Sequence, residues 1–361
     1  MRIAYYAPLK SPDHPVPSGD RQMAQMLKAA LQLAGNTVEL ASEFRSFSAT
    51  PTVESHAAAL AEAEREIARL SALWEAGQKP DLWFCYHPYY KAPDLIGPRL
   101  TTRFAIPYVT AEASYSGRRN VGIWAQTQAD LADSVRKAAL NICFTARDRG
   151  GLAEIAPQGR FEMLPPFIDV AAFAAPPPTP DLSKLIAVGM MRPGDKMESY
   201  RMLARALEML PHLPWRLSIV GDGACRAEVE AEFSRIAPGR IEWLGERRPA
   251  EVPNLLRGAG IYVWPGCGEA YGLAYLEAQA AGLPVVAQHI AGVPEVVRHG
   301  ITGLLTQAGD IAALAGAIER LLTNGSESLE LGAAARRFVF EERSLEAAAK
   351  RLATILPRVG A

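Results

Sequence analysis

A glycine-rich segment in the second half of the chain carries two glutamates that suit a phosphorylated, hydroxyl-bearing ligand. Residues 264–277 read Trp-Pro-Gly-Cys-Gly-Glu-Ala-Tyr-Gly-Leu-Ala-Tyr-Leu-Glu, between an apolar run and a helical run that residues 282–284 end. Such a turn exposes backbone N–H groups at the positive end of a helix dipole, where phosphate binds. Glu269 and Glu277 bracket the turn, and carboxylates accept hydrogen bonds from sugar or ribose hydroxyls. A glycine-rich turn with two solvated glutamates is the alternative interpretation.

A histidine and a proline-rich loop in the first half are further candidates. His87 directly follows the apolar run 81–86, and open α/β sheets bind ligands at the carboxyl ends of their strands. His87 is therefore a candidate for binding a ligand, with a structural role as the alternative. The loop 8–20 contains His14 and Asp20, two weaker candidates for ligand binding whose alternative role is that of exposed polar loop residues.

Short apolar runs that alternate with longer amphipathic stretches must position these residues. The runs that predict strands are 3–7, 37–41, 81–86, 108–110, 141–145, 185–188, 217–220, 241–244, 261–264 and 285–287. The stretches that predict helices are 19–34, 56–76, 130–139, 200–210, 273–281, 310–322 and 345–356. Strands separated by helix-length segments predict parallel sheets with helices on both faces.

A proline-rich stretch separates the two halves. Pro165-Pro166 is followed by Pro-Pro-Pro-Thr-Pro over residues 176–180, a density of proline that no helix interior or central strand accommodates. We therefore expect an α/β protein with two Rossmann-like domains joined by a linker. Ligands of such sheets bind at the strand carboxyl ends, so we expect the parallel sheets to face a central cleft.

Composition narrows the class of protein. The length of 361 residues suggests two domains, with three possible, and 49% hydrophobic residues are ordinary for a globular chain. The 38 lysines and arginines balance 39 aspartates and glutamates, so the basic excess typical of nucleic-acid binders is missing. Four scattered cysteines argue against a disulfide framework. Without a signal-peptide pattern or a long apolar run, we expect a cytoplasmic protein.

The chained motifs of the second half resemble the signature of the family 4 retaining glycosyltransferases, GT-B enzymes that use nucleotide-activated sugars. The resemblance covers residues 269–287, then Ile-Ala-Gly-Val-Pro-Glu at 290–295 and Gly-Ile-Thr-Gly-Leu-Leu at 300–305. It extends back to Ser-Ile-Val-Gly-Asp-Gly at 218–223, Trp-Leu-Gly at 243–245 and Phe-Ile-Asp at 167–169. About half of the chain, and nearly all of its second domain, is similar to that family.

The resemblance implies a division of the chain. It implies an N-terminal acceptor-binding domain over residues 1–168, a linker over 169–182 and a nucleotide-sugar-binding domain over 183–340. It also implies that residues 341–361, which begin near the motif Phe-Glu-Glu-Arg at 340–343, form a helix that crosses back to the N-terminal domain. His87, Asp20 and His14 of the first domain would then be weak candidates for binding the acceptor.

The resemblance also implies roles for single residues. Glu277 would hold the ribose hydroxyls of the nucleotide, and Glu269 would contact the transferred sugar. The backbone N–H groups of the turn would support the diphosphate and the sugar, and residues after the preceding strand would flank the base. The residues of these last two groups are Ala270, Tyr271, Gly272 and Leu273 in the turn, and Gly245, Glu246 and Arg247 beside the base.

The family places two cations after the first strand of the second domain. They stabilise the negative charge that grows on the nucleoside diphosphate as it leaves. This loop, residues 189–196, begins with Gly189 and contains Lys196, which matches the family. Met190 stands where the family usually has arginine, so Arg192 is assigned that role. The chain contains no Asp-x-Asp pair, and we therefore expect neither a catalytic metal nor a cofactor.

In the first domain the family has a flexible glycine-containing loop and a histidine that touches the donor sugar. Gly19 is the counterpart in the loop 8–20, and Glu112 stands at the position that best matches the histidine. Glu112 is therefore a catalytic candidate that orients or deprotonates an acceptor hydroxyl, or the role has moved elsewhere.

The resemblance implies a retaining, metal-independent transfer of sugar from a UDP-, GDP- or ADP-sugar to a small-molecule, glycan or lipid acceptor. Nucleic acid is not an expected partner, and no basic amphipathic helix indicates contact with a membrane. Two alternatives remain at this point. One is another GT-B activity such as an epimerase, and the other is a non-catalytic protein that binds nucleotide sugars.

Overall fold

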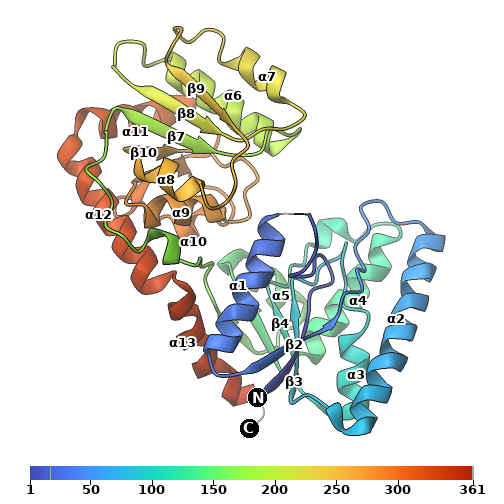
Figure 1. Cartoon of the computed structure of the whole chain (residues 1–361). Coiled ribbons are helices and arrows are strands. Elements are labelled where there is room, and N and C mark those ends of the chain that lie inside the picture. Colours follow the sequence, from blue (N-terminus) through green and yellow to red (C-terminus); the bar gives the residue numbers. More distant parts are fainter. Residues whose placement is uncertain (17, 360–361) are drawn as a thin grey trace. The chain divides into compact units, whose positions relative to one another are not determined.

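Each half of the chain builds its own parallel six-stranded sheet (Figure 1). The computed structural model describes residues 1–16 and 18–359. They divide into unit 1, which combines Met1–Pro165 with the residues from Leu345 onward, and unit 2, Pro166–Ser344. Residue 17 of the proline-rich loop and residues 360–361 of the expected C-terminal segment lie outside the described residues. The predicted α/β class with two parallel sheets is confirmed.

The sheet of unit 1 runs in the order β2-β1-β3-β4-β5-β6, with every pair of neighbours parallel. From β1 the chain continues to β2 on one side and then to β3 on the other side of β1, so the strand order reverses between β1 and β3. This is the switch point where ligands of such sheets bind. The strands are β1 (Arg2–Tyr6), β2 (Thr37–Ser42), β3 (Leu82–Tyr86), β4 (Tyr108–Ala111), β5 (Leu140–Cys143) and β6 (Phe161–Met163).

Helices cover both faces of this sheet. One core lies between the strands and α2 with α3, and it is built around buried Trp74, Trp83 and Leu100. The helices of unit 1 are α1 (Gly19–Leu33), α2 (Val53–Leu73), α3 (Gly97–Phe104), α4 (Trp124–Lys137), α5 (Ala146–Ile155) and α13 (Leu345–Ile355). Short helical turns add η1 (Trp74–Gln78), η2 (Gly117–Arg119) and η4 (Leu356–Val359).

The C-terminal helix α13 packs against α1 in unit 1 (Figure 1). Its apolar side chains Leu352 and Ile355 are fully buried. Arg351 fixes the helix to β6, because its guanidinium lies 2.6 Å from the Glu162 carboxylate and 3.2 Å from the Met163 carbonyl. The predicted return of a C-terminal helix to the N-terminal domain is confirmed.

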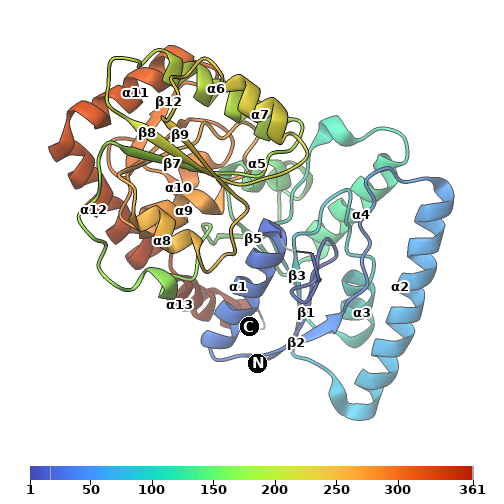
Figure 2. The same cartoon turned by 45° about the horizontal axis from the view of Figure 1, so that its top comes forward.

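The sheet of unit 2 runs in the order β12-β11-β10-β7-β8-β9. Figure 2 shows β7, β8 and β9 side by side in this sheet. If the strands are numbered from β7 as the first and the order is read from β9, this is the order 3-2-1-4-5-6 of dinucleotide-binding folds. The switch point of such folds lies between the first and fourth strands. Here those two strands are β7 and β10. The strands are β7 (Lys184–Val188), β8 (Arg216–Val220), β9 (Ile241–Gly245), β10 (Ile261–Val263), β11 (Val285–Gln288) and β12 (Gly303–Thr306).

Two groups of helices enclose the sheet of unit 2. Helix α6 packs against α7 and α11, whereas α9 packs against α8 and α12. The helices are α6 (Asp195–Glu208), α7 (Arg226–Glu232), α8 (Val252–Arg257), α9 (Leu273–Ala280), α10 (Val293–Val296), α11 (Ile311–Thr323) and α12 (Gly325–Glu342), with a helical turn η3 (Ala171–Phe173).

Several predicted boundaries were wrong where capping, rather than periodicity, decides them. The strand predicted over 141–145 ends at Cys143, because the Thr145 side chain accepts the Asp148 N–H and so caps α5. The helix predicted over 200–210 begins at Asp195, where acidic residues in the first turn suit the helix dipole. The helix predicted over 130–139 spans Trp124–Lys137, and the one predicted over 56–76 is α2 followed by η1.

Candidate functional site

The switch point of unit 2 brings two loops into close contact. The loop after β7 begins at Gly189, and the loop after β10 begins at Trp264. A Cβ atom on Gly189 would lie only 2.8 Å from the Trp264 ring, so a larger residue there would push the loops apart. Tyr200 of α6 supports the contact, because its hydroxyl donates to the Gly189 carbonyl at 2.6 Å and its ring meets Trp264 edge-on.

Two adjoining hollows open beside these loops. The larger, of about 680 Å³, lies along the ends of β7, β8 and β9. The smaller, of about 360 Å³, lies between the start of α6 and the loop after β10. Both are lined by Arg192 and Lys196. The larger hollow is also lined by Gly189, Met190, Asp222, Gly223, Glu246 and Arg247, and the smaller by Asp195, Cys267, Gly268 and Glu269.

Lys196, in the first turn of α6, and Glu269, in the loop after β10, form an ion pair. Their side chains are only 16% and 17% exposed, so water screens the pair less than it screens a surface pair. The Trp264 indole Nε1–H donates to the same carboxylate at 3.2 Å. The Lys196 ammonium also lies 5.4 Å from the centre of the Trp264 ring, a cation–π distance. Two residues predicted from sequence to serve one ligand are therefore in direct contact.

The loop after β10 turns sharply into α9. Gly272 has a φ of +79°, and a Cβ atom there would lie 2.7 Å from the Tyr275 ring, so this position requires glycine. The turn leaves Ala270 exposed and Tyr271 buried. The first N–H groups of α9, like those of any α-helix, have no partner within the helix. Leu273 is the first residue of α9.

Glu277 lies one turn into α9 and is half-buried. Burial raises the pKa of the Tyr262 hydroxyl well above its ordinary value, and the nearby charges of Glu269 and Glu277 raise it further. The Tyr262 hydroxyl also donates to the Val188 carbonyl at the end of β7, at 3.3 Å. Both glutamates predicted from the glycine-rich motif therefore lie near the junction of β7 and β10.

The end of β9 forms the far rim of the larger hollow. Gly245 has a φ of +68°, and the exposed residues Glu246 and Arg247 follow it. Asp222, after β8, is held by Arg226 at 2.7 Å and accepts the Gly223 N–H at 2.8 Å. These contacts hold the carboxylate of Asp222 at the side of the hollow.

A second cluster lies at the switch point of unit 1. His87, directly after β3, has its Nδ1 atom 3.4 Å from the Asp20 carboxylate in the first turn of α1. This is ion-pair distance, although Nδ1 lacks the geometry of a hydrogen bond. Burial lowers the pKa of His87, but the carboxylates of Glu112, Asp20 and Asp148 outweigh burial and raise it above 6.5.

Backbone strain marks two of these residues. His87 and Glu112, which directly follow β3 and β4, both have a φ of +56°. Non-glycine residues rarely adopt this conformation, and such residues cluster at functional sites. Glu112 is 6% exposed. The structure therefore brings His87, Asp20 and Glu112 into one cluster.

The remaining candidates of the first half are His14 and Gly19, of which Gly19 directly precedes Asp20 of this cluster. His14 stabilises a loop turn, in which its Nδ1 accepts the Val16 N–H at 3.1 Å. Gly19 is the first residue of α1, with open space where a side chain would stand. Nothing in its surroundings requires glycine.

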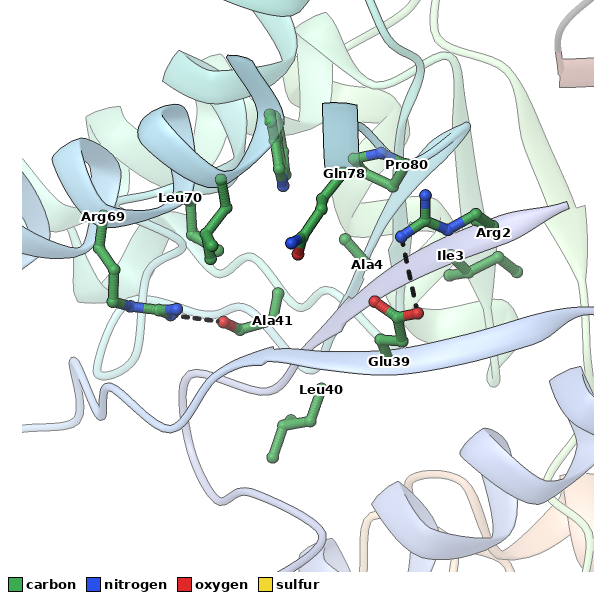
Figure 3. A pocket seen from close by; sticks show the side chains of 12 residues that line it. Arg2, Ile3, Ala4, Glu39, Leu40, Ala41, Arg69, Leu70, Gln78 and Pro80 are labelled. Carbon is green, nitrogen blue, oxygen red and sulfur yellow. Dashed lines mark hydrogen bonds and ion pairs between the residues drawn. The ribbon is translucent and has the colours of Figure 1, made fainter. Parts of the chain in front are cut away.

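A third hollow, of about 110 Å³, lies near the start of β1 in unit 1 (Figure 3). Arg2 and Glu39 form an ion pair at 3.7 Å on one side, and Arg69 donates to the Ala41 carbonyl on the other. Its floor is apolar, with Ile3, Ala4 and Leu70 among the lining residues. Its lining shares no residue with the two hollows of unit 2 or with the cluster around His87.

Sequence reasoning missed Trp264, Asp222 and Asp148 as residues of these clusters. Trp264 follows an apolar strand, so its type and position indicated core packing. Its polar indole N–H was the only sequence signal of a second role. Asp148 sits in a helix that was not predicted.

The described part of the chain contains neither a metal-binding cluster nor a membrane-spanning helix. Over residues 1–16 and 18–359, no three side chains of histidine, cysteine, aspartate or glutamate gather in a way that could hold a metal ion. Within the same residues, no helix combines the length and apolar character needed to cross a bilayer.

The sequence of this chain is similar to those of known glycosyltransferases. Residues 183–324 match the family model "Glycosyl transferases group 1". A D-inositol 3-phosphate glycosyltransferase of Rhodococcus erythropolis is 34% identical over 143 residues, which are 38% of this chain and 32% of the relative. That of Frankia alni is 27% identical over 69% of this chain and 68% of the relative. The chain thus spans from about a third to about two thirds of the length of these relatives.

Solved structures share the fold over nearly the whole chain. Sucrose-phosphate synthase from Thermosynechococcus elongatus superposes with a TM-score of 0.74 at 19% identity, over 99% of both chains. HepE from Anabaena, in complex with UDP, superposes with a TM-score of 0.74 at 17% identity, over 99% of this chain and 100% of that one. At these identities the similarity shows the fold.

Proposed function

We propose that this protein transfers a sugar from a nucleotide-sugar donor to an acceptor, because residues 183–324 match the glycosyl transferases group 1 and the whole chain has the GT-B fold. One observation carries the proposal: Lys196, Glu269 and the turn before α9 lie together at the switch point of unit 2. This is the place where α/β sheets bind nucleotides.

The two hollows suit the two halves of such a donor. The nucleoside would occupy the larger hollow, with Glu246 and Arg247 beside the base and Glu277 accepting hydrogen bonds from the ribose hydroxyls. The sugar would occupy the smaller hollow, where Glu269 would accept hydrogen bonds from its hydroxyl groups. Arg192 and Lys196 line both hollows, so the diphosphate would lie where the hollows adjoin.

Charge on the diphosphate has side-chain partners in this arrangement. Arg192 is exposed, and no ion pair holds it among the described residues, so its guanidinium can turn to a phosphate. Lys196 and the N–H groups at Gly272 and Leu273 add positive potential. Cations placed at the leaving group stabilise the transition state more than the ground state. We therefore include metal independence in the proposal.

The cluster of His87, Asp20 and Glu112 in unit 1 would bind the acceptor. Carboxylates accept hydrogen bonds from hydroxyl groups, and Glu112 would orient the attacking hydroxyl. The leaving phosphate would take the hydroxyl proton on the face from which it departs, which retains the anomeric configuration. The resemblance to retaining enzymes supports this course of the reaction.

The donor half of the proposal is tested by the substitution Glu277→Gln. Loss of a charged acceptor should weaken the binding of the preferred nucleotide, chosen from UDP, GDP and ADP, by roughly tenfold or more in calorimetry. Glu228→Gln, an exposed glutamate in the first turn of α7, is the matched control and should leave affinity unchanged. Equal affinity of the wild type and Glu277→Gln would refute the assignment of Glu277 to the ribose.

A further inference from the structure

We infer that Trp264 is a positioning residue that aims one oxygen of the Glu269 carboxylate at the donor sugar. The inference rests on the proposed function, in which Glu269 contacts the sugar. It goes further because it names the residue that fixes the orientation of that carboxylate.

Both recorded contacts of the carboxylate end on the same oxygen. The Lys196 ammonium pairs with Oε1 of Glu269, and the Trp264 indole Nε1–H donates to that atom at 3.2 Å. Among the described residues, no recorded hydrogen bond or ion pair ends on Oε2. Because two donors hold Oε1, the carboxylate cannot rotate without losing them, and Oε2 is left to accept a hydroxyl hydrogen of the sugar.

The surroundings of Trp264 leave its ring little freedom. The residue is 2% exposed, and Gly189 lacks the Cβ atom that would clash with the ring. On the neighbouring helix the Tyr200 ring meets Trp264 at 78°, with 4.9 Å between ring centres. The Tyr275 hydroxyl fixes the backbone, because it donates to the Trp264 carbonyl at 3.1 Å. An N–H group on so confined a ring is a fixed donor.

The same ring also places the cation. The Lys196 ammonium lies 5.4 Å from the ring centre, within reach of a cation–π interaction. The edge of the indole therefore donates a hydrogen bond to the Glu269 carboxylate, and the face of the indole attracts the Lys196 ammonium. A phenylalanine could keep the face but has no N–H, so Trp264→Phe removes the contact to Glu269 selectively.

A purely structural role for Trp264 makes a different prediction. If the ring served only to fill the core, its loss would disturb the whole switch point. UDP, which lacks the sugar, and UDP-glucose would then lose affinity alike. If Trp264 acts through Glu269, only the ligand that carries a sugar loses affinity.

The first arm of the test compares these two ligands. We expect Trp264→Phe to weaken UDP-glucose roughly tenfold in calorimetry and to leave UDP within about twofold of the wild type. Trp215→Phe is the matched control, because Trp215 is also 2% exposed and its Nε1–H also donates, to the Leu210 carbonyl. It should change neither affinity. Equal loss of UDP and UDP-glucose in Trp264→Phe would overturn the inference.

The second arm is a double-mutant cycle with Glu269→Gln. Residues that act through one contact give non-additive effects. Adding Trp264→Phe to Glu269→Gln should therefore cost little further affinity for UDP-glucose. An undiminished further loss in the double variant would show that Trp264 acts by another route, and would overturn the inference.

The third arm needs no ligand and keeps the inference testable if Trp264→Phe folds poorly. Each tryptophan gives one indole N–H resonance in a ¹H–¹⁵N spectrum, and triple-resonance assignment of the wild type identifies those of Trp264 and Trp215. In Glu269→Gln the Trp264 resonance should shift while that of Trp215 stays in place. An unmoved Trp264 resonance would overturn the inference. Failure of the wild type to bind UDP and UDP-glucose would refute that donor and leave this arm to decide the role of Trp264.

Discussion

His87 shows how several charges act on one side chain. Its imidazole lies beside three carboxylates, those of Asp20, Glu112 and Asp148, which raise its pKa above 6.5 in spite of burial. The charge of His87 in turn helps to hold the pKa of Asp20 below its usual value, against the opposing effect of burial. The strained φ of His87 keeps the ring at the end of β3, where these groups meet.

The pH dependence of this cluster follows from the sign of the shift. Because the folded-state pKa of His87 is raised, its protonated form stabilises the fold fully below pH 6.5. That contribution is lost as the pH rises through the raised value. An NMR titration of the His87 imidazole should give a pKa above 6.5, and Asp20→Asn should lower it. A pKa at or below 6.5 in the wild type would contradict the account.

At the scale of residues, the glycine-rich motif of residues 264–277 predicted those features of the site that depend only on the local backbone conformation. Gly272 is required by its positive φ, and the turn that contains it could be recognised from the spacing of its glycines. The contact between Trp264 and Glu269 could not be recognised, because it depends on how closely the loops after β7 and β10 approach. That distance is set by Gly189 and Tyr200, which lie more than 60 positions from Trp264 in the sequence.

Helix α13 shows how an element far away in the sequence completes a domain. It follows unit 2 in the chain but packs against α1 of unit 1. Its buried residues Leu352 and Ile355 are both fully covered, so they carry most of its apolar contact.

Removing part of that contact should destabilise unit 1 and spare unit 2. We expect Leu352→Ala to lower the free energy of unfolding of unit 1 by about 2–5 kcal/mol, because the cavity forms against α1. Hydrogen exchange followed by mass spectrometry should show faster exchange in α1 and unchanged exchange in α9. Lys350→Ala, an exposed position on the same helix, should change neither. Faster exchange confined to unit 2 would contradict the packing.

At the scale of elements, strongly apolar runs were predictable and weakly patterned ones were not. The strand β3 is buried along its whole length, and its apolar run marked it clearly. Helix α5 was missed because it contains Gly150-Gly151 and buries only Leu152, so it shows almost no helical periodicity. The strand β12 was missed because its four residues follow a glycine-rich turn.

At the scale of the whole molecule, the two units have the same kind of sheet with polar clusters at the same kind of position. Each unit has a parallel sheet with a switch point, between β1 and β3 in one and between β7 and β10 in the other. The polar clusters lie at these two places. The alternation of strands and helices predicted the two sheets, but strand order depends on tertiary packing, so the switch points required the structure.

The central claim is that a nucleotide sugar binds at the switch point of unit 2 without a metal ion. The most direct test is hydrogen exchange measured in EDTA, with and without UDP-, GDP- and ADP-glucose. The account predicts that at least one of them slows exchange in the loops after β7, β9 and β10, and leaves the hollow beside Arg2 and Glu39 unchanged. Protection confined to that hollow, or protection that appears only when magnesium or manganese is added, would contradict it.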